Sequence, residues 1–527
     1  MSSGRIINRR EALRLAAGAG AGLGLFGSLP LLEGCAGTTG RRPANILFIF
    51  SDDHAPHAIS AYGSRINTTP HIDRIAREGA LFANSFCTNS ICAPSRAVVL
   101  TGKHSHANGK IDNRNVFDMS QPTVNKYLQG AGYETAMIGK WHLQAEPEGF
   151  DFWQVLPGQG NYYNPDFDTP DGRVRHEGYV TDIITDLTLD WLQHGRSADR
   201  PFLCMCQHKA PHRNWVPGPD YMNLYEGETI PEPATLFDDW SGHASPAAAQ
   251  EMTVARHMMP FYDLKITPWE SEPRPNSWYG RMTAEQRAAW DAVYEPRNAA
   301  FHRAGLEGRE LTSYYYQRYI KDYLRCIASV DDNVGRLLAF LDESGLADDT
   351  LVIYSSDQGF YLGDHGWFDK RWIYEESLRM PFLARWPGVI RPGTRVEEMI
   401  QNIDYAPTFL TAAGLDVPAD IHGVPLLGLM RGRHPRDWRR SIYYHYYEFP
   451  AVHMVARHYG VRTERYTLAY FYETDEWELF DLETDPHQLT SVYDDPAYAG
   501  TVVELTAELG RLRDAYADET GLDFRDR

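Results

Sequence analysis

The side chains best suited to chemistry gather around Cys92. Pro94, Ser95 and Arg96 follow it, and then an apolar run that ends at Gly102. Pro94 and Ser95 can open a helix, which would place Cys92 just ahead of the positive N-terminal end, where an anion is favoured. The pattern alone leaves two interpretations open: a nucleophilic cysteine with a stabilised charge, or a core cysteine beside a turn.

Oxygen donors occur in two places far apart in the chain. Asp52 and Asp53 follow one apolar run, and Asp357 and Gln358 follow another. Hard oxygen ligands of this kind suit Ca²⁺ or Mg²⁺, whereas zinc would prefer His or Cys. Asp pairs after strands are also common as turn residues or helix caps, so the spacing alone leaves a structural role open.

Lysine and histidine side chains occur in three further polar clusters. They are Lys140, His142, His212 and Lys370. Taken singly, each would more often be a solvated or capping residue. An ester that carries negative charge on its oxygens is recognised by positive and hydrogen-bonding groups. These four side chains, together with a divalent cation, would supply such groups.

Four continuous apolar runs precede most of these polar clusters. They cover residues 46–50, 135–138, 202–206 and 351–354. Continuous apolar runs suit strands buried on both faces of a parallel sheet. Because ligands bind outside the carboxyl ends of such strands, the clusters should meet at one sheet edge.

The rest of the pattern predicts an α/β fold, a large and mostly parallel sheet flanked by helices. Residues 320–341 have helical apolar spacing, and Gly345 is a plausible stop. Residues 220–310 lack a steady period and are interpreted as an irregular insertion. Residues 465–472 and 476–482 predict paired strands, and a helix over 502–512 should cover this small antiparallel sheet.

Composition narrows the class of protein. The chain has 527 residues, 43% of them hydrophobic, which is ample for a core. Its formal charge of -20 argues against a nucleic-acid partner. The six cysteines are too irregularly spaced for a disulfide framework or a zinc cluster.

The N-terminal residues 1–35 are interpreted as an export signal. Arg9 and Arg10 with Leu13 resemble a twin-arginine signal, and the apolar run is too Gly-rich and short to span a bilayer. The run ends at Cys35 in a sequence that resembles a lipoprotein cleavage box, which would tether the protein to a membrane through a lipid. Residues 36–44 are interpreted as a linker. The protein is expected in the periplasm or at the cell surface.

The run from Cys92 through Pro94, Ser95 and Arg96, with Leu100-Thr101-Gly102, resembles the signature of the type I sulfatases of the alkaline phosphatase superfamily. The likeness extends over about residues 45–485 with motifs in the family's order. It implies a catalytic domain over 45–440 and a C-terminal subdomain over 441–527. It also implies that a formylglycine-generating enzyme oxidises Cys92 to formylglycine.

The resemblance assigns roles by position. The implied catalytic residues are Cys92, Arg96, Lys140, His142, His212 and Lys370. The implied ligands of Ca²⁺, or alternatively Mg²⁺, are Asp52, Asp53, Cys92, Asp357 and Gln358. The family usually has Asn or His where this chain has Gln358, and an amide oxygen can still coordinate.

The mechanism implied by the resemblance begins with a hydroxyl of the hydrated formylglycine at position 92 attacking sulfur. Arg96 and Lys140 would hold the formylglycine oxygens, and His212 and Lys370 would bind the sulfate and assist departure of the sugar oxygen. His142 would then accept a proton from the second hydroxyl, which releases sulfate without hydrolysis at sulfur.

The expected substrate is a sulfated carbohydrate. Residues 457–463 and 367–371 resemble bacterial glycan sulfatases that include N-acetylglucosamine-6-sulfatases, which suggests a 6-sulfated hexosamine. The side chains expected to contact the sugar are Asp364, His365, Arg457 and His458.

Two other classes of function remain open. One is a phosphate or phosphonate ester hydrolase of the same superfamily, although such phosphatases typically pair two metals with a Ser or Thr nucleophile. The other is a non-catalytic glycan-binding lipoprotein in which Cys92 is never oxidised. Turnover of phosphate esters, or an unmodified thiol at position 92, would favour these alternatives.

Overall fold

A computed structural model describes residues 43–267 and 277–526. The predicted export signal and its acylation site Cys35 lie outside these residues. Among the residues that are described, no helix combines the length and apolarity needed to cross a bilayer.

The main sheet has ten strands in the order β13-β2-β12-β9-β1-β8-β4-β5-β6-β7. Their bounds are β13 (Thr394–Val396), β2 (Ala80–Phe82), β12 (Phe382–Arg385), β9 (Thr350–Ser356), β1 (Asn45–Ser51), β8 (Phe202–Gln207), β4 (Glu134–Lys140), β5 (Phe152–Leu156), β6 (Asp166–Thr169) and β7 (Gly172–Arg175). The four predicted apolar runs form the adjacent strands β9, β1, β8 and β4, which pair in parallel. The predicted fold class is confirmed.

The central strand β1 shows why its run is continuously apolar. Ile46, Phe48 and Phe50 point into one hydrophobic core, whereas Leu47 and Ile49 point into another. Both faces of a strand must be apolar when helices cover both faces of the sheet.

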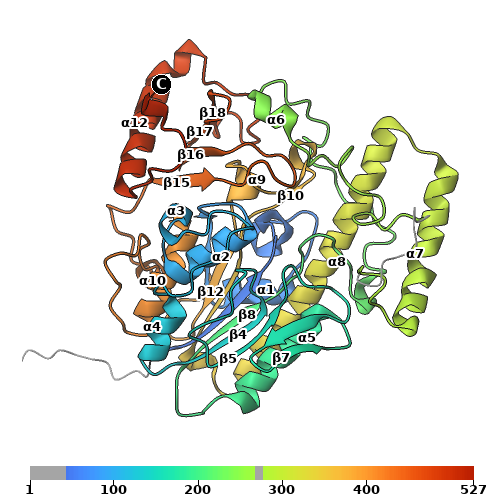
Figure 1. Cartoon of the computed structure of the whole chain (residues 1–527), viewed down its shortest axis with the longest axis vertical. Coiled ribbons are helices and arrows are strands. Elements are labelled where there is room, and N and C mark those ends of the chain that lie inside the picture. The colour runs from blue at the N-terminus through green and yellow to red at the C-terminus, as the bar shows by residue number, and fades with distance from the viewer. Residues whose placement is uncertain (1–42, 268–276, 527) are drawn as a thin grey trace, which may run out of the picture. The chain divides into compact units, whose positions relative to one another are not determined.

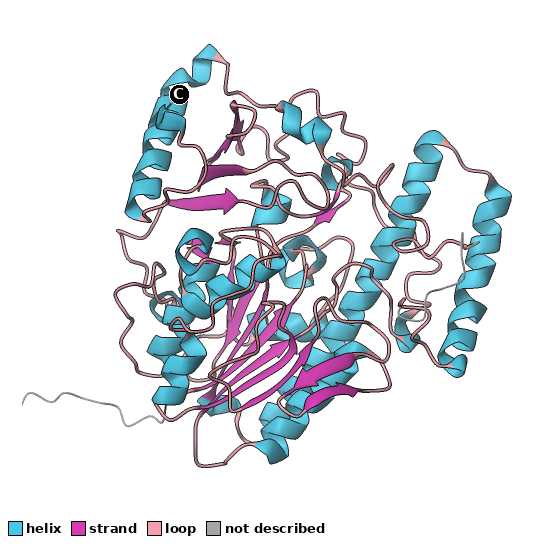
Figure 2. Ribbon diagram, viewed as in Figure 1, coloured by secondary structure: helices cyan, strands magenta, loops and turns pink. Residues whose placement is uncertain are grey.

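Helices cover both faces of this sheet (Figures 1 and 2). One face packs against α2 (Cys92–Thr101), α4 (Val124–Gly130) and α10 (Tyr405–Ala412). The other packs against α1 (Pro70–Arg77), α5 (Val180–Asp190) and α8 (Gly308–Glu343). The helix predicted over residues 320–341 is the C-terminal part of α8, which ends two residues before Gly345.

The segment expected to be irregular contains α6 (Ser245–Ala249) and a regular helix, α7 (Ala284–Ala304). A capping box of Thr283 and Gln286 begins α7. Only a narrow stripe of α7 is buried, and Trp290 and Tyr294 stack within it at 3.9 Å between ring centroids. Because so few positions are buried, the apolar periodicity that predicts a helix is weak here.

A second sheet lies near the C-terminus and contains β15 (Ser441–Tyr446), β16 (His458–Thr463), β17 (Tyr466–Phe471) and β18 (Glu476–Asp481), all antiparallel. The predicted strand pair is β17 and β18, and α12 (Ala499–Ala515) packs Leu505, Leu509 and Leu512 against the sheet. The predicted subdomain starts at the first residue of β15, and the division into domains stays a prediction.

Short elements connect these parts. They are β3 (Ser85–Phe86), β14 (Ile400–Gln401), β10 (Tyr361–Leu362), β11 (Phe368–Asp369), α3 (Ser105–Asn108), α9 (Glu375–Leu378) and α11 (Leu427–Met430). The turn η6 (Asp364–Gly366) joins the paired strands β10 and β11.

Candidate active site

The carboxyl ends of the four central strands carry the predicted polar clusters. Asp52 directly follows β1, Lys140 ends β4, Gln207 ends β8 and Asp357 directly follows β9. The backbone N–H of Asp53 donates to Asp357 Oδ1 at 3.0 Å, which joins the first and last of these clusters. Parallel pairing therefore gathers residues that are more than 300 positions apart in the chain.

Carboxylates at this edge form an oxygen-rich cluster that fits a hard cation. Asp52, Asp53 and Asp357 each place an oxygen within 4.8 Å of the others, and all three are buried. Asp52 Oδ1 and Gln358 Oε1 are also buried and lack a hydrogen-bond partner within the described part of the chain. Carboxylate and amide oxygens without partners are the donor set that Ca²⁺ or Mg²⁺ takes.

Lysine side chains balance part of the negative charge. Lys370 Nζ lies 2.7 and 2.8 Å from the two carboxylate oxygens of Asp53, and Lys140 Nζ contacts Asp52 Oδ2. Burial raises the pKa of Asp53 to about 7, although the charge of Lys370 lowers it. Buried carboxylates are costly without positive charge, so the site is built to hold cations.

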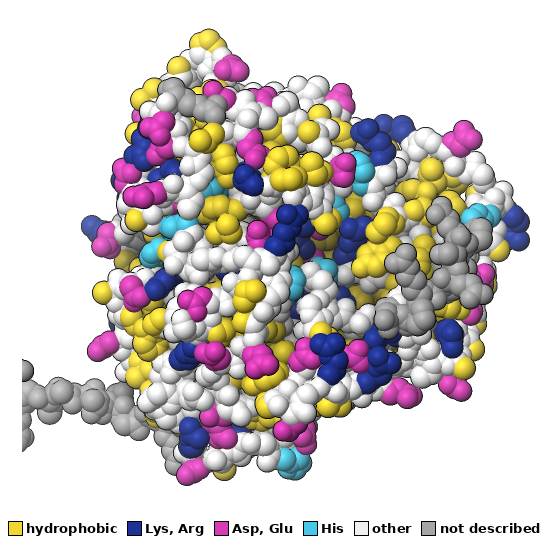
Figure 3. Space-filling view, in the orientation of Figure 1, with side chains coloured by type: hydrophobic (Ala, Val, Ile, Leu, Met, Phe, Trp, Pro, Cys, Tyr) yellow, Lys and Arg dark blue, Asp and Glu magenta, His cyan; other side chains and the backbone are white. Residues whose placement is uncertain are grey.

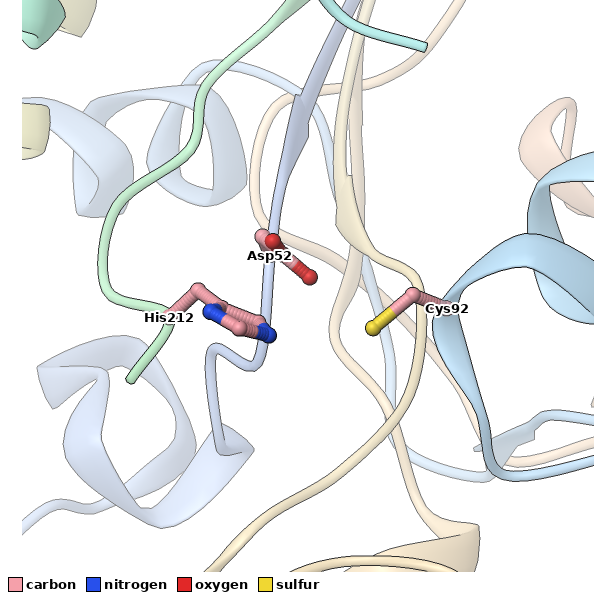
Figure 4. Close-up of side chains that lie close together, drawn as sticks. All are labelled: Asp52, Cys92 and His212. Carbon is pink, nitrogen blue, oxygen red and sulfur yellow. The ribbon is translucent and has the colours of Figure 1, made fainter. Parts of the chain in front are cut away.

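Cys92 is the first residue of α2, one position further into the helix than the sequence predicts. Its Sγ lies 3.8 Å from Gln358 Nε2. Burial raises the pKa of the Cys92 thiol well above its usual range, so the thiol stays neutral. Figure 4 shows the Cys92 and His212 side chains pointing toward one another beside Asp52, and a ligand atom from each lies within 4.8 Å of the others.

The Arg96 guanidinium ties α2 to the strand ends. Its Nε and Nη2 donate to Asp357 Oδ2 at 3.1 and 2.9 Å. Its Nη1 donates to the Lys140 carbonyl at 2.8 Å and to Gln207 Oε1 at 2.5 Å. A fully engaged planar guanidinium has one orientation, so Arg96 fixes the geometry around Cys92.

The two predicted histidines are both held neutral. Burial, and then the charge of Lys140, lowers the pKa of His142 and that of His212 well below the usual value. His212 Nδ1 donates to the Arg213 carbonyl at 2.5 Å, and its Nε2 lies 3.8 Å from Asp53 Oδ2. His142 Nδ1 is buried without a hydrogen-bond partner among the residues described. A neutral imidazole can accept a proton.

Cys92, His212 and Lys370 line a cavity of about 350 Å³. The other lining residues are mostly polar: Asn113, Arg114, Gln159, Arg213, Tyr262, Asp369, Arg371, Glu448, Val452 and His453. His142 lines a neighbouring hollow with Trp141 and Gln144. The cavity is large enough for a sugar ring and carries both guanidinium and carboxylate groups.

Asp364 and His365, expected to contact the sugar, do not line this cavity. Asp364 Oδ2 lies 3.5 Å from His57 Nε2, on the wall of a different hollow. The His365 ring is fully buried and stacks on Trp367 at 5.2 Å.

Arg457 and His458 also lie outside the lining of this cavity. Arg457 donates to the carbonyls of Tyr447 and Phe449, so it holds the loop that carries Glu448. His458 is buried, and its Nε2 accepts the N–H of Ile373 at 3.1 Å. Both side chains are committed to protein contacts.

Sequence reasoning did not assign Asp369 or Arg371 to the cavity, and from the stretch 453–459 it selected Arg457 and His458 in place of His453. Asp369 Oδ1 accepts from Arg371 Nε at 2.9 Å, and its Oδ2 lies 3.4 Å from His453 Nε2. All three have positive φ, of 80°, 93° and 72°. The sequence signal that could have identified Asp369 and Arg371 is the charged run on both sides of Lys370. Charged residues are rarely buried unless they are paired or have a function.

The comparisons with known proteins agree with this geometry. Residues 44–415 match the sulfatase family, and residues 363–515 match the C-terminal region of N-sulphoglucosamine sulphohydrolase. The chain therefore belongs to the sulfatase family, and it is a sulfuric ester hydrolase. The family generally uses formylglycine and a divalent metal.

Individual relatives are similar to this chain over most of its length. The chain is 45% identical over 489 residues to N-acetylglucosamine-6-O-sulfatase of Bacteroides thetaiotaomicron, covering 91% of this chain and 87% of that protein. It is 25% identical over 451 residues to human N-acetylglucosamine-6-sulfatase, covering 79% of this chain and 70% of that protein. A solved structure in complex with its substrate D-glucosamine-2-N,6-O-disulfate superposes with a TM-score of 0.89 at 44% identity, covering 91% of this chain and 99% of that one.

Proposed function

We propose that this sulfatase removes the 6-O-sulfate of a glucosamine or N-acetylglucosamine unit in a sulfated glycan. The similarity to an N-acetylglucosamine-6-O-sulfatase over most of both chains supports this substrate class. So does the similarity to a structure that holds a 6-O-sulfated glucosamine.

The observation that carries the proposal is the position of Cys92 on the wall of the cavity, opposite His212 and beside the carboxylate cluster. A formylglycine at position 92 would supply an oxygen nucleophile in its hydrated form, and a divalent cation would supply positive charge for the sulfate oxygens. Asp52, Asp53, Asp357 and Gln358 would hold that cation, which we propose to be Ca²⁺.

The charged groups around Cys92 would orient the reacting atoms. Lys140 Nζ contacts the Asp52 carboxylate and donates to Gln159 Oε1 at 2.6 Å. These two contacts keep the ammonium near the carboxylate cluster. Arg96 would act by positioning, since its donors are already used. His142 would accept the proton that must leave position 92 when sulfate is released.

Departure of the sugar oxygen needs assistance, because an alkoxide is a poor leaving group. His212 Nε2 and Lys370 Nζ both face the cavity side of Asp53 and would bind the sulfate. A bound sulfate would favour the protonated form of His212, which could then donate that proton to the leaving oxygen.

The far part of the cavity would recognise the sugar ring. Asp369, Arg371 and His453 offer acceptors and donors that suit hydroxyl groups. Arg114 adds positive charge that suits further sulfate groups, whereas Asp263 balances the charge of Arg213. On the face shown in Figure 3, Lys and Arg side chains gather near the middle of the molecule, although acidic residues outnumber basic ones in the chain.

Two partners complete the proposal. A formylglycine-generating enzyme would oxidise Cys92 before the cavity closes around it, since the folded thiol is buried. Export through residues 1–35, with a lipid tether at Cys35, would bring the enzyme to glycans outside the cytoplasm.

The test is release of sulfate from sugars sulfated at O6, O4, O3 or O2, with protein co-produced with a formylglycine-generating enzyme and a Cys92→Ala control. Release from the 6-sulfated sugar alone supports both the reaction and the position. Release from another member keeps the reaction and rejects the sugar assignment. Faster turnover of phosphate than of sulfate esters would instead favour the phosphate or phosphonate hydrolase.

A further inference from the structure

A second cluster of metal-ligating side chains lies outside the cavity that contains Cys92. Asp238, His243 and His365 place one ligand atom each within 4.8 Å of the others. Both imidazole side chains are fully buried, and Asp238 is 13% exposed. None of the three belongs to the oxygen cluster described above.

Two of the distances between these atoms match the edges of a small tetrahedron, and the third pair lies within 4.8 Å. His365 Nδ1 lies 3.3 Å and His243 Nε2 lies 3.5 Å from Asp238 Oδ2. Zinc binds nitrogen and carboxylate oxygen at about 2.0–2.1 Å, so ligand atoms of a tetrahedral site are separated by about 3.4 Å.

Each histidine also has a carboxylate facing its other ring nitrogen. His243 Nδ1 lies 3.2 Å from the Tyr374 hydroxyl, which donates to Glu478 Oε2 at 2.6 Å, and 3.6 Å from Glu478 Oε1. His365 Nε2 lies 3.8 Å from Glu376 Oε2. Metal-binding histidines almost always donate their second N–H to such a partner, which fixes the tautomer. Each histidine ring therefore has one nitrogen directed toward Asp238 and the other directed toward a second carboxylate.

His365 Nδ1 and Asp238 Oδ2 share a hydrogen bond of 3.3 Å, whereas the third ligand atom and two atoms on the outer side of the cluster have none among the residues described. His243 Nε2, His365 Nε2 and Glu376 Oε2 are buried and have no hydrogen-bond partner in the described parts of the chain. Buried polar atoms in folded proteins are rarely left unpaired, and a bound ion is one partner that satisfies them. The surrounding carboxylates make the cluster electrostatically suited to a cation.

We propose that Asp238, His243 and His365 bind a Zn²⁺ ion, with a water molecule as the fourth ligand. Two nitrogens and one carboxylate oxygen suit zinc and differ from the all-oxygen set beside Cys92. The ion would join the segment before α6 to the turn η6, and Glu478 would extend the connection to β18. Because η6 leads into β11 and Lys370, zinc would stabilise the segment that carries this lysine.

The test is zinc content and zinc-dependent stability of the full-length protein. The protein is first saturated with Ca²⁺, then equilibrated with Zn²⁺ and passed through a desalting column. We expect about one Zn²⁺ per chain, and a higher melting temperature than in the zinc-free sample because the ion binds the folded state. His243→Phe and His365→Phe keep an aromatic ring in place and should lose both effects.

His434→Phe is the matched control, since His434 is 51% exposed and lies outside the cluster. It should retain zinc like the unmodified protein. If the buried variants do not fold, Co²⁺ replaces Zn²⁺ in the unmodified protein and in Asp238→Ala. Tetrahedral visible absorption bands that disappear in Asp238→Ala support the site. A folded protein that retains no zinc, or variants that keep it, would overturn the proposal and leave an ion-pair cluster.

Discussion

Asp53 is the residue on which the contacts of the active site converge. Its carboxylate receives Lys370 and Gln358, its N–H donates to Asp357, and its carbonyl accepts from Tyr323 on α8 at 2.7 Å. Its φ of 66° is unusual for a residue with a Cβ. Contacts from several elements therefore hold one carboxylate in one orientation, as a preorganised cation site requires.

At the same scale, Cys92→Ser tests whether the side chain at position 92 is the nucleophile. A serine can be sulfated but has no second hydroxyl with which to expel the sulfate. We expect steady-state sulfate release to fall by ~10³-fold or more, and the protein to accumulate one covalently bound sulfo group. Intact-protein mass spectrometry during turnover measures this directly.

Cys204→Ser is the control for that experiment, because Cys204 is equally buried but lies in β8 away from the cavity. It should keep its sulfate release. Multiple turnover by Cys92→Ser at the unmodified rate would show that another group attacks sulfur.

A further prediction at the residue scale concerns Gln358, the least certain of the metal ligands that the family resemblance implies. If its free Oε1 binds the cation, Gln358→Leu should raise the Ca²⁺ concentration for half-maximal reactivation after chelation by ~10-fold or more. Gln358→Glu keeps an oxygen there and should not show this loss. Equal Ca²⁺ requirements for the Leu variant and the unmodified enzyme would remove Gln358 from the ligand set.

Among the elements, β4 shows how a strand end positions a side chain of the candidate active site. Gly139 precedes Lys140 and has a φ of +103°. A Cβ at this position would lie 2.0 Å from the Gln207 carbonyl oxygen in the neighbouring strand β8. Close approach of these two strands brings Lys140 beside Asp52, and only glycine allows it.

Gly139→Ala should therefore separate β4 from β8 and displace Lys140. We expect a loss of roughly 3 kcal/mol or more in unfolding free energy, from backbone strain and the clash together. Chemical denaturation measures the loss, and sulfate release should fall with it. Gly130→Ala is the control, because a Cβ at Gly130 has no heavy atom within 4 Å. Equal stability of both variants would contradict this account of the strand end.

The helices differ in how well the sequence predicts them. α8 buries a continuous apolar stripe that includes Tyr323, Ile327 and Val334, so its period is visible in the sequence. α7 buries little and carries Pro296 within it, so its period is hidden. A helix stabilised by its cap and a few aromatic contacts leaves little periodic signal.

In the whole molecule, buried histidines make stability depend on pH. Burial lowers the pKa of His54, His208 and His458 to about 3 and that of His422 and His445 to about 4. In the unfolded chain these groups titrate near 6.5. Between those values the unfolded state binds more protons, so stability falls as the pH falls below about 6.5.

We expect the free energy of unfolding to decrease steeply between pH 7 and pH 5. One fully buried histidine accounts for about 2 kcal/mol of this decrease. His208→Asn should reduce the decrease by about that amount, because Asn does not titrate. Urea unfolding at both pH values measures it, with exposed His434→Asn as the control. The same slope in both variants would mean that other groups govern the acid response.

The candidate site was largely predictable at the level of motifs. Asp52, Lys140 and His212 lie together because motifs that end or follow adjacent parallel strands must converge. Cys92 at the start of α2 and Lys370 after β11 join them from outside the parallel sheet. The other polar side chains that line the cavity, such as Asp369, Arg371 and His453, were not predictable in this way. They lie at the end of β11, just after it, or in the loop between β15 and β16, and whether a side chain there faces the cavity or the core depends on local backbone turns.

The sequence by itself determined the fold class and the central strands, because strand burial is a local pattern, and the resemblance of the motif around Cys92 indicated the sulfatase family. Only the tertiary structure decided which polar side chains line the cavity. Asp369 and Arg371 turn toward it, whereas His365, a few positions earlier, is buried beside Trp367. The reason is physical: the direction of a side chain in irregular backbone is fixed by φ values and by packing partners that are distant in the chain.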